Sequence, residues 1–336
     1  MNLIERAYQK IVRESDSLIR ETGGRAGIYN QLYRNASGGR MVVYHGICKK
    51  DHTRFSPTFL EQHTFEAHLQ FFRKHFNVVS LEEYFENKTS SRFTVCLSFD
   101  DGLANNLYYV LPLLEQYRLP ATFFITGARE AGYDILWNDF LNIVTKSGPV
   151  KLEYKGKLYT KNRFGRYEDT TSIALAEYLR SADFDAKKEM MELLAPLAGF
   201  RDNGDDEEYW RLLNEEELFT LSQSPWVTIG SHGYYHNDLG RIDSDKANQE
   251  MISSRKYLEK ITGKEVKSIA FPYGSYSPDV KDLAIKAGYK QLLGTESLQP
   301  EDVGKDFIKS RLTINPFIPV HAQMQAIIKG YYANWK

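Results

Sequence analysis

From residue 41 onward, short runs of apolar and β-branched residues alternate with stretches of helical periodicity, and no other feature limits the fold of this chain so strongly. Strands joined through helices favour a parallel sheet, because parallel strands need a long crossover connection. The clearest run, TVCLSF at 94–99, is apolar at nearly every position, as expected of a strand covered on both faces. Further runs predict strands at 41–44, 121–125, 227–231, 268–271, 291–294 and 309–314. The expected class is therefore α/β, with about seven β/α units in a barrel or an open doubly wound sheet.

Helical periodicity fills the intervals between these runs. Residues 65–76 repeat large apolar side chains on one face, and 106–117 do the same. The helix predicted over 244–261 should end at Gly263, and Ser277 should cap the start of the next helix.

Residues 148–222 interrupt the alternation. The segment 150–161 predicts a hairpin that turns at Lys155-Gly156, and Asn214 with Glu217 resembles a capping box at the start of a helix. We interpret 148–222 as an insertion of hairpin and helices within one domain.

That domain is expected to span residues 41–325, after an N-terminal helical segment at 1–40. Apolar residues at helical spacing predict a helix over 3–20, and early charges at Glu5 and Arg6 are unlike a secretory signal. No apolar stretch is long enough for a transmembrane helix. A cytoplasmic location is the expectation from these features.

The charge balance excludes some partners. Lys and Arg number 43 against 44 Asp and Glu, without a long block of either sign, which argues against a nucleic-acid partner. The two cysteines cannot build a disulfide framework, and Cys96 has the surroundings of a small buried residue.

Polar clusters follow directly after several predicted strands. In parallel barrels, the carboxyl ends of the strands form the active-site face, so these clusters should meet on one rim. They are Tyr44-His45, Asp100-Asp101, Ser231-His232 and Pro272-Tyr273.

The residues on this rim suit a divalent metal. His232 and His236 are close enough in the chain to face one cation, and two histidines with a carboxylate leave a coordination position open, as in catalytic zinc sites. Of the adjacent Asp100 and Asp101, one can ligate metal while the other stays free as a base. Asp-Asp-Gly alone is a common turn sequence, but its place on the same rim as the histidines favours the metal interpretation. Zinc is the first candidate, and Fe, Co, Ni or Mn also suit such ligands.

Three motifs give a specific resemblance. SFDDG at 98–102 resembles the TFDDG signature of the polysaccharide deacetylases, the NodB-homology or carbohydrate esterase family 4 group. SHGYYH at 231–236 resembles that family's H-[ST]-x-x-H motif, and FPYG at 271–274 resembles its R-x-P-Y motif. LPATFF at 119–124 fits the strand after the aspartates. The resemblance runs from 41 to 315 in this order, without the inserted stretch.

The resemblance implies a distorted (β/α) barrel and a metal-dependent hydrolase that deacylates an N-acetylated glycan. By position, it makes Asp100 the general base and Asp101, His232 and His236 the metal ligands. The backbone N–H of Tyr273 would bind the oxyanion.

The chain departs from the family pattern at several positions. Gly233 replaces the usual serine or threonine, and Ala270 replaces the arginine that orients the base. Arg311 is a candidate to replace that arginine, although it could equally be a surface or structural residue. The usual late Leu-x-His, source of the general acid, is missing. Tyr44-His45 instead resembles the early Tyr-His of the poly-N-acetylglucosamine branch, which implies His45 as the acid.

The substrate is less defined than the chemistry. Trp137 and Asp139, which follow the strand predicted at 121–125, could stack on and hydrogen-bond a sugar ring, but Trp137 could equally fill the core. Tyr273 and Arg311 are further candidates for contact with the substrate or its oxyanion. Substrates linked to a nucleotide or lipid carrier are compatible with a cytoplasmic location. Alternatives are a deformylase of a lipid-linked amino sugar, a hydrolase of a non-sugar amide, or a catalytically silent glycan-binding module. The complete set of two aspartates and two histidines argues against the silent module.

Overall fold

The computed structural model describes residues 12, 15–16, 18–87, 90–295 and 298–332. The helix expected over 3–20 lies largely outside these residues, and residues 18–25 are helical. Among the described residues, no helix is both long and apolar enough to cross a membrane.

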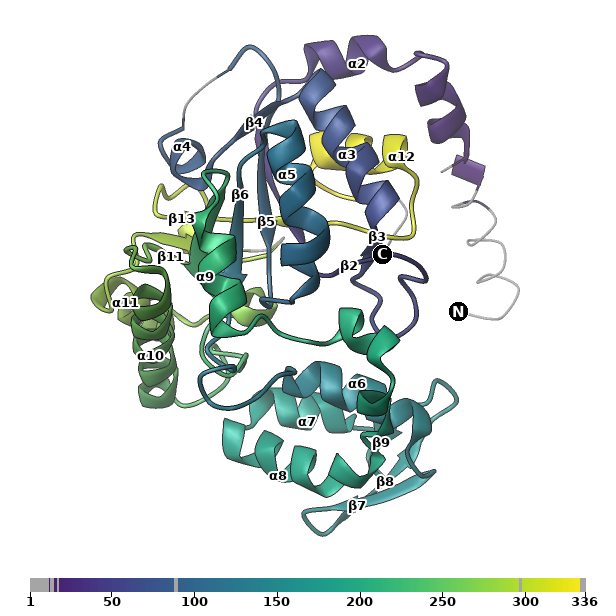
Figure 1. Cartoon of the computed structure of the whole chain (residues 1–336), viewed down its shortest axis with the longest axis vertical. Coiled ribbons are helices and arrows are strands. Elements are labelled where there is room, and N and C mark those ends of the chain that lie inside the picture. Colours follow the sequence, from purple (N-terminus) through teal and green to yellow (C-terminus); the bar gives the residue numbers. More distant parts are fainter. Residues whose placement is uncertain (1–11, 13–14, 17, 88–89, 296–297, 333–336) are drawn as a thin grey trace.

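A parallel sheet forms the centre of the molecule and curls into part of a barrel with helices around it (Figure 1). The expected α/β class and distorted barrel are therefore confirmed. Its strands, in spatial order, are β13 (Ile308–Lys309), β12 (Gln291–Leu293), β11 (Ser268–Ala270), β10 (Val227–Ser231), β6 (Ala121–Ile125), β5 (Thr94–Phe99), β1 (Gly39–Tyr44) and β14 (Leu312–Thr313), while β4 (Asn77–Val79) also pairs with β5. Every residue of β5 is buried, as its apolar sequence predicts.

The prediction of one strand at 309–314 is wrong, because the structure has two short strands there. β13 pairs with β12 and β14 pairs with β1, so these consecutive short strands occupy opposite ends of the sheet order. Ser310 and Arg311 join them. The two edges of the sheet are therefore linked by the backbone around Arg311.

The apolar faces and cap residues predicted for the helices that cover the sheet are present in the structure. Phe65, Leu69 and Phe72 of α3 are fully buried. Gly263 ends α10 in the left-handed conformation, and Ser277 accepts a hydrogen bond from the N–H of Val280 at the start of α11. The helices are α2 (Asn30–Asn35), α3 (Gln62–His75), α4 (Leu81–Phe85), α5 (Leu111–Tyr117), α9 (Glu215–Gln223), α10 (Ser244–Thr262), α11 (Pro278–Lys286) and α12 (Val320–Lys329), with a π-helical turn, η1 (Asn106–Val110), before α5.

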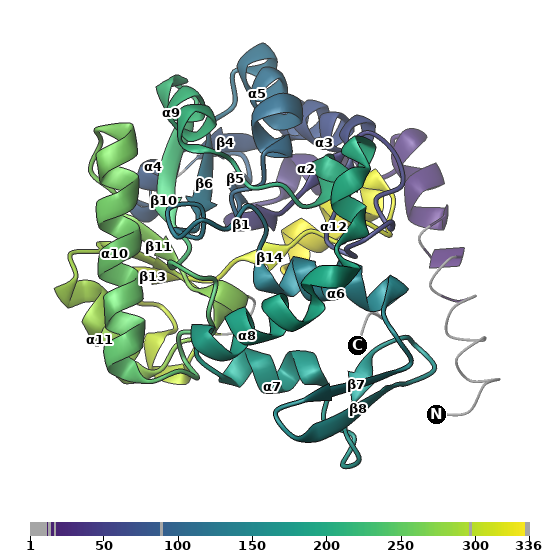
Figure 2. The ribbon, with the colours of Figure 1, turned by 60° about the horizontal axis from the view of Figure 1, so that its bottom comes forward.

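Between β6 and β10, the chain leaves the sheet and forms a second layer. The expected hairpin is present, with Lys155 and Gly156 in left-handed conformations at its turn. A separate hydrophobic core holds this layer together. Figures 1 and 2 show its helices side by side at the end of the molecule where β6 leads into α6. The elements are α6 (Trp137–Ser147), β7 (Lys151–Tyr154), β8 (Lys157–Lys161), β9 (Tyr167–Glu168), α7 (Leu175–Ser181) and α8 (Phe184–Leu194).

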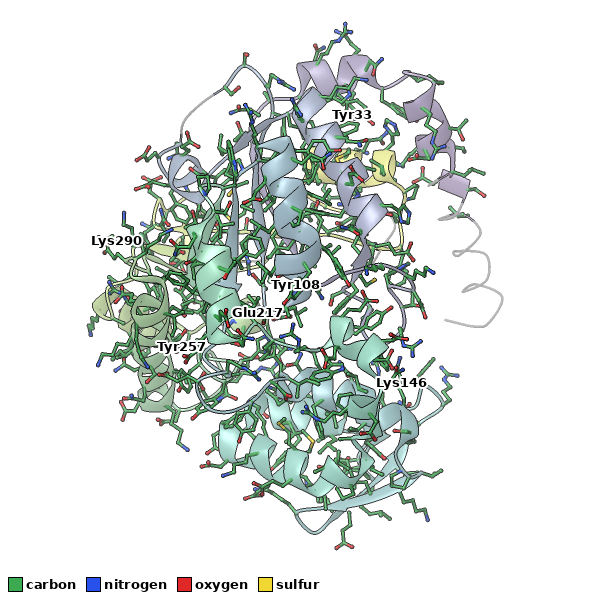
Figure 3. The ribbon with its side chains drawn as sticks, viewed as in Figure 1. Tyr33, Tyr108, Lys146, Glu217, Tyr257 and Lys290 are labelled. Atoms are coloured by element: carbon green, nitrogen blue, oxygen red, sulfur yellow. The ribbon has the colours of Figure 1, made fainter. Side chains whose placement is uncertain are left out.

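Glu217 connects the start of α9 to its surroundings. Its carboxylate completes the predicted capping box with Asn214, accepts two hydrogen bonds from the Arg211 guanidinium, each 2.8 Å long, and accepts one from the Tyr108 hydroxyl. Figure 3 shows Tyr108 and Glu217 near each other, the first from η1 and the second from α9.

We predict that Glu217→Ala lowers the free energy of unfolding by about 1–2 kcal/mol, since it removes both the cap and a half-buried ion pair. Urea denaturation measures this change. The exposed neighbour Glu216 provides the control, because Glu216→Ala changes charge in the same helical turn without removing the cap. Equal losses in the two variants would contradict the capping role.

Candidate active site

The predicted polar residues lie directly after the carboxyl ends of neighbouring strands, on one rim of the sheet. The pairing of the strands continues into these residues: the N–H of Asp100 donates to the carbonyl of Tyr44, and the N–H of His232 donates to the carbonyl of Ile125. The backbone hydrogen bonding of the sheet therefore extends to Asp100 and His232 at the rim.

Asp101, His232 and His236 come together at the centre of this rim. All three are buried, and one ligand atom from each lies within 4.8 Å of the others. Asp101 Oδ1 is 3.5 Å from His232 Nε2 and 3.3 Å from His236 Nε2. Two segments that are distant in the sequence thus converge on one small volume.

The imidazole of His232 is oriented by the barrel. Its Nδ1 lies 2.7 Å from the carbonyl oxygen of Ala270, an arrangement in which Nδ1–H donates and Nε2 keeps its lone pair toward Asp101. Burial lowers the pKa of His232 to about 4, despite the charge of Asp100. The ring is therefore neutral at pH 7, as a metal ligand must be.

The backbone at the site adopts left-handed conformations that few residues tolerate. Asp101, His236 and Tyr273 have φ values of 78°, 56° and 59°. Each such residue costs about 1–3 kcal/mol unless its surroundings impose the conformation, and such costs concentrate at functional sites. Gly233 also has a positive φ, 73°, which explains why glycine is suited to the position where the family has serine or threonine.

Asp100 lies beside these three residues and is paired with Arg311. The guanidinium donates to both carboxylate oxygens, at 2.7 and 2.8 Å, and its Nε donates to the carbonyl of Gly294. Burial alone would raise the pKa of Asp100, but Arg311 and His232 lower it below its ordinary value. Asp100 therefore stays ionised, 3.8 Å from His232 Nε2.

Arg311 takes the place of the arginine missing at Ala270. It is 1% exposed, so it is neither a surface residue nor open to a substrate oxyanion, which corrects its place among the expected substrate contacts. Sequence pattern alone did not distinguish these possibilities, because the pairing depends on the curl of the sheet.

His45 lies next to the aspartates, directly after β1. Burial would raise the pKa of Asp101, but the His236 imidazole, 3.3 Å away, and the neighbouring imidazoles of His45 and His232 lower it below the ordinary range. The carbonyl of His45 accepts a hydrogen bond from the side chain of Asn106. His45 is partly exposed.

Trp137 is not a platform for sugar stacking. It is 3% exposed and belongs to the core of the second layer, which favours the alternative that it fills the core. Its indole N–H donates to the carbonyl of His236 at 3.0 Å, so it supports the loop that carries a predicted ligand. Asp139 is also buried, and burial together with the charge of Asp101 raises its pKa well above the ordinary value.

The side chain of Tyr273 faces His236, with ring centroids 4.9 Å apart. Its hydroxyl is buried and has no hydrogen-bond partner within the part of the chain that the structure describes. Burial raises its pKa well above the ordinary value, so the phenol remains protonated.

Two residues near the site were not predicted from sequence. Glu250 of α10 accepts hydrogen bonds from the N–H groups of Tyr234 and Tyr235, at 3.2 and 3.1 Å. An acidic residue on the apolar face of a predicted helix was the available signal. His68 of α3 is buried, and its Nδ1 contacts the Tyr44 hydroxyl. Its spacing from the buried phenylalanines of α3 could have shown this.

The sequence matches a family model described as polysaccharide deacetylase at residues 87–160 and 192–292, which together make up more than half of the chain. No curated protein matches it. Similar solved structures include the deacetylase PplD of Streptococcus pyogenes in complex with acetate, at 17% identity and a TM-score of 0.56, over 86% of this chain and 97% of that chain. IcaB of Ammonifex degensii is similar at 14% identity and a TM-score of 0.53, over 87% of this chain and 97% of that chain. A polysaccharide deacetylase of Bacillus cereus is similar at 17% identity and a TM-score of 0.54, over 86% of this chain and 68% of that chain. At these identities, the likeness shows the fold alone.

We predict that Arg311→Met lowers the free energy of unfolding by about 3–5 kcal/mol, because it leaves the buried Asp100 without its counter-charge. The double variant Asp100→Asn, Arg311→Met should recover part of this loss. Chemical denaturation of the single and double variants measures the coupling, and strictly additive losses would contradict it.

The same pair predicts a pH dependence. Because the pKa of Asp100 is lower in the folded protein than in the unfolded chain, its stabilisation is present above about pH 4 and is lost as the pH falls. The stability difference between the wild type and Asp100→Asn should therefore shrink as the pH falls from about 4 to about 2. A constant difference over that range would be inconsistent with a lowered pKa.

Proposed function

Because the chain belongs to the polysaccharide deacetylase family, whose members hydrolyse amide bonds of acetylated sugars, we propose that it is a metal-dependent hydrolase that removes the N-acetyl group from an amino sugar in a glycan. One observation supports this proposal above the others. Asp100 is ionised and buried beside the group formed by Asp101, His232 and His236, yet it is held by Arg311 and is not part of that group.

The residues present suit a metal ion. Asp101 Oδ1 and the two imidazole nitrogens lie 3.3 and 3.5 Å apart, longer than good hydrogen bonds and compatible with ligands that surround a cation. His232 already uses Nδ1 in a hydrogen bond, so Nε2 is its available ligand atom. Asp101, His232 and His236 would hold a divalent cation, with zinc the first candidate. When bound, it would polarise the acyl oxygen and lower the pKa of a water molecule.

Asp100 is the proposed general base that takes the proton from the attacking water. A base must be unprotonated before the reaction, and Arg311 ensures this by holding the pKa of Asp100 low. Because both carboxylate oxygens accept from the same guanidinium, the side chain has one orientation.

His45 is the proposed general acid that protonates the leaving sugar amine. It lies on the rim beside both aspartates and is partly exposed, so it can reach a substrate that enters from solvent. The backbone N–H of Tyr273 is the proposed donor to the oxyanion, in a turn whose left-handed conformation is shown by its φ of 59°.

We propose an N-acetylated poly- or oligosaccharide, or a carrier-linked precursor of one, as the substrate. The matched family supports the sugar amide. Release of formate in place of acetate would identify the alternative deformylase.

We predict that Asp101→Ala abolishes stoichiometric metal binding, whereas Asp100→Asn keeps the metal and lowers kcat by about 10²–10⁴-fold, as expected for the loss of a general base. Metal analysis and an amine-release assay on N-acetylglucosamine oligomers measure both effects. Wild-type turnover in Asp100→Asn would show that the base is wrong. A wild type that binds metal but hydrolyses no sugar amide would support the silent glycan-binding module.

His45→Gln is expected to lower kcat by about 10²-fold or more without reducing the amount of bound metal, because it removes the acid and no proposed ligand. The loss should be smaller on an activated substrate whose leaving group needs no proton. His63→Gln is a suitable control, since His63 is exposed in the first turn of α3. Equal losses on both substrates would argue against a role in protonation.

A further inference from the structure

The loop that carries His232 and His236 is supported from two sides. On one side, Glu250 of α10 holds the N–H groups of Tyr234 and Tyr235. On the other side, residues 235–238 contact the second layer of the molecule. Gly233 has no hydroxyl that could hydrogen-bond within the loop, and His236 has a positive φ. The contacts on both sides therefore help to hold His236 in position.

Arg180 of α7 binds a buried carboxylate close to the proposed ligand His236. Its Nε lies 2.6 Å from an oxygen of Asp238, a carboxylate with no exposed surface. Asp238 follows His236 by two residues. Arg241 also approaches that oxygen, but at 3.5 Å and from a more exposed position. Arg180 is therefore the main counter-charge of a buried carboxylate beside the proposed ligand.

The same guanidinium covers Tyr273. Its central carbon is 4.5 Å from the centre of the Tyr273 ring, and that ring in turn packs against the imidazole of His236. Stacking of this kind uses the planar guanidinium, which lysine lacks. The side chain of Arg180 thus contacts two loops at the rim of the sheet, the loop that carries His236 and the loop that carries Tyr273.

α8 adds contacts to the same loop. Lys187 is buried, with its ammonium group hydrogen-bonded to the side chain of Asn237 and to the carbonyl of Ala182. The ring of Phe184 stacks on that of Tyr235, 4.0 Å away and nearly parallel. Arg180, Phe184 and Lys187 lie between 161 and 191, the segment that separates the two regions matched by the family model, whereas Trp137, which donates to the carbonyl of His236, lies in the first matched region.

We propose that Arg180 is a positioning residue, supplied by the segment 161–191, which holds His236 and Tyr273 in their working arrangement. The proposal rests on the proposed function, because His236 matters here as a metal ligand. It implies that the affinity of this chain for its metal depends on a part of the sequence that the family model does not cover.

The test uses the full-length chain without substrate. Stripped protein is titrated with Co²⁺, and the visible absorption of the bound ion reports both affinity and ligand geometry. Arg180→Ala should weaken Co²⁺ binding by about 10–100-fold and alter the spectrum. Arg180→Lys, which keeps the charge but not the planar stack, should recover part of the affinity. Lys155→Ala is the matched control, because it removes an exposed ion pair with Glu189 in the same layer and should leave binding unchanged.

Turnover separates positioning from substrate binding. Arg180→Ala should lower kcat, with a smaller effect on KM. Should the alanine variant fold poorly, Arg180→Met keeps an apolar stem while it removes the charge and the N–H donors, and the same weakening of Co²⁺ binding is expected. Wild-type Co²⁺ affinity and spectrum in a folded Arg180 variant would overturn the proposal, as would a rise in KM alone. A wild type that binds no Co²⁺ would instead refute the proposed function.

Discussion

The buried ion pair between Asp100 and Arg311 is the interaction on which the rest of the site depends. Isolated charges are costly inside a protein, and this pair is stable only because both carboxylate oxygens and the guanidinium nitrogens find partners. Arg311 lies between β13 and β14, the strands at opposite ends of the sheet order. The pair therefore joins the closing segment of the sheet to the central strand β5, and it fixes the orientation and charge of the proposed base.

At Ala270 and Gly233, where the chain departs from the family pattern, residues elsewhere in the chain make the missing interaction. Ala270 carries no charge, but a guanidinium reaches the same carboxylate from Arg311, while the carbonyl of Ala270 orients His232. Gly233 carries no hydroxyl, and the loop is held instead by Glu250 and by the second layer. What the chemistry requires is a charge or a hydrogen bond at a point in space, and distant parts of the chain can supply it.

Sequence patterns predicted the parts of the molecule that depend on local physics. The strands 94–99, 121–125 and 227–231 have the predicted bounds, because a buried parallel strand needs an uninterrupted apolar run. The convergence of Asp101 with His232 and His236 followed from the rule that parallel strand ends share a rim. The partners of Arg311 and Arg180 could not be read in this way. Both pairs join residues far apart in sequence, and only the curl of the sheet and the packing of the second layer bring them together.

The position of Arg311 near the end of the domain has a consequence for the order in which the site matures. A chain emerging from the ribosome completes Asp100, Asp101, His232 and His236 before β13 and β14 exist. Until those last strands dock, the carboxylate of Asp100 lacks its guanidinium partner and the sheet lacks its closing segment. The metal-binding residues are thus all synthesised before the guanidinium that fixes the charge of Asp100, and the site is complete only when the last segment of the sheet has docked.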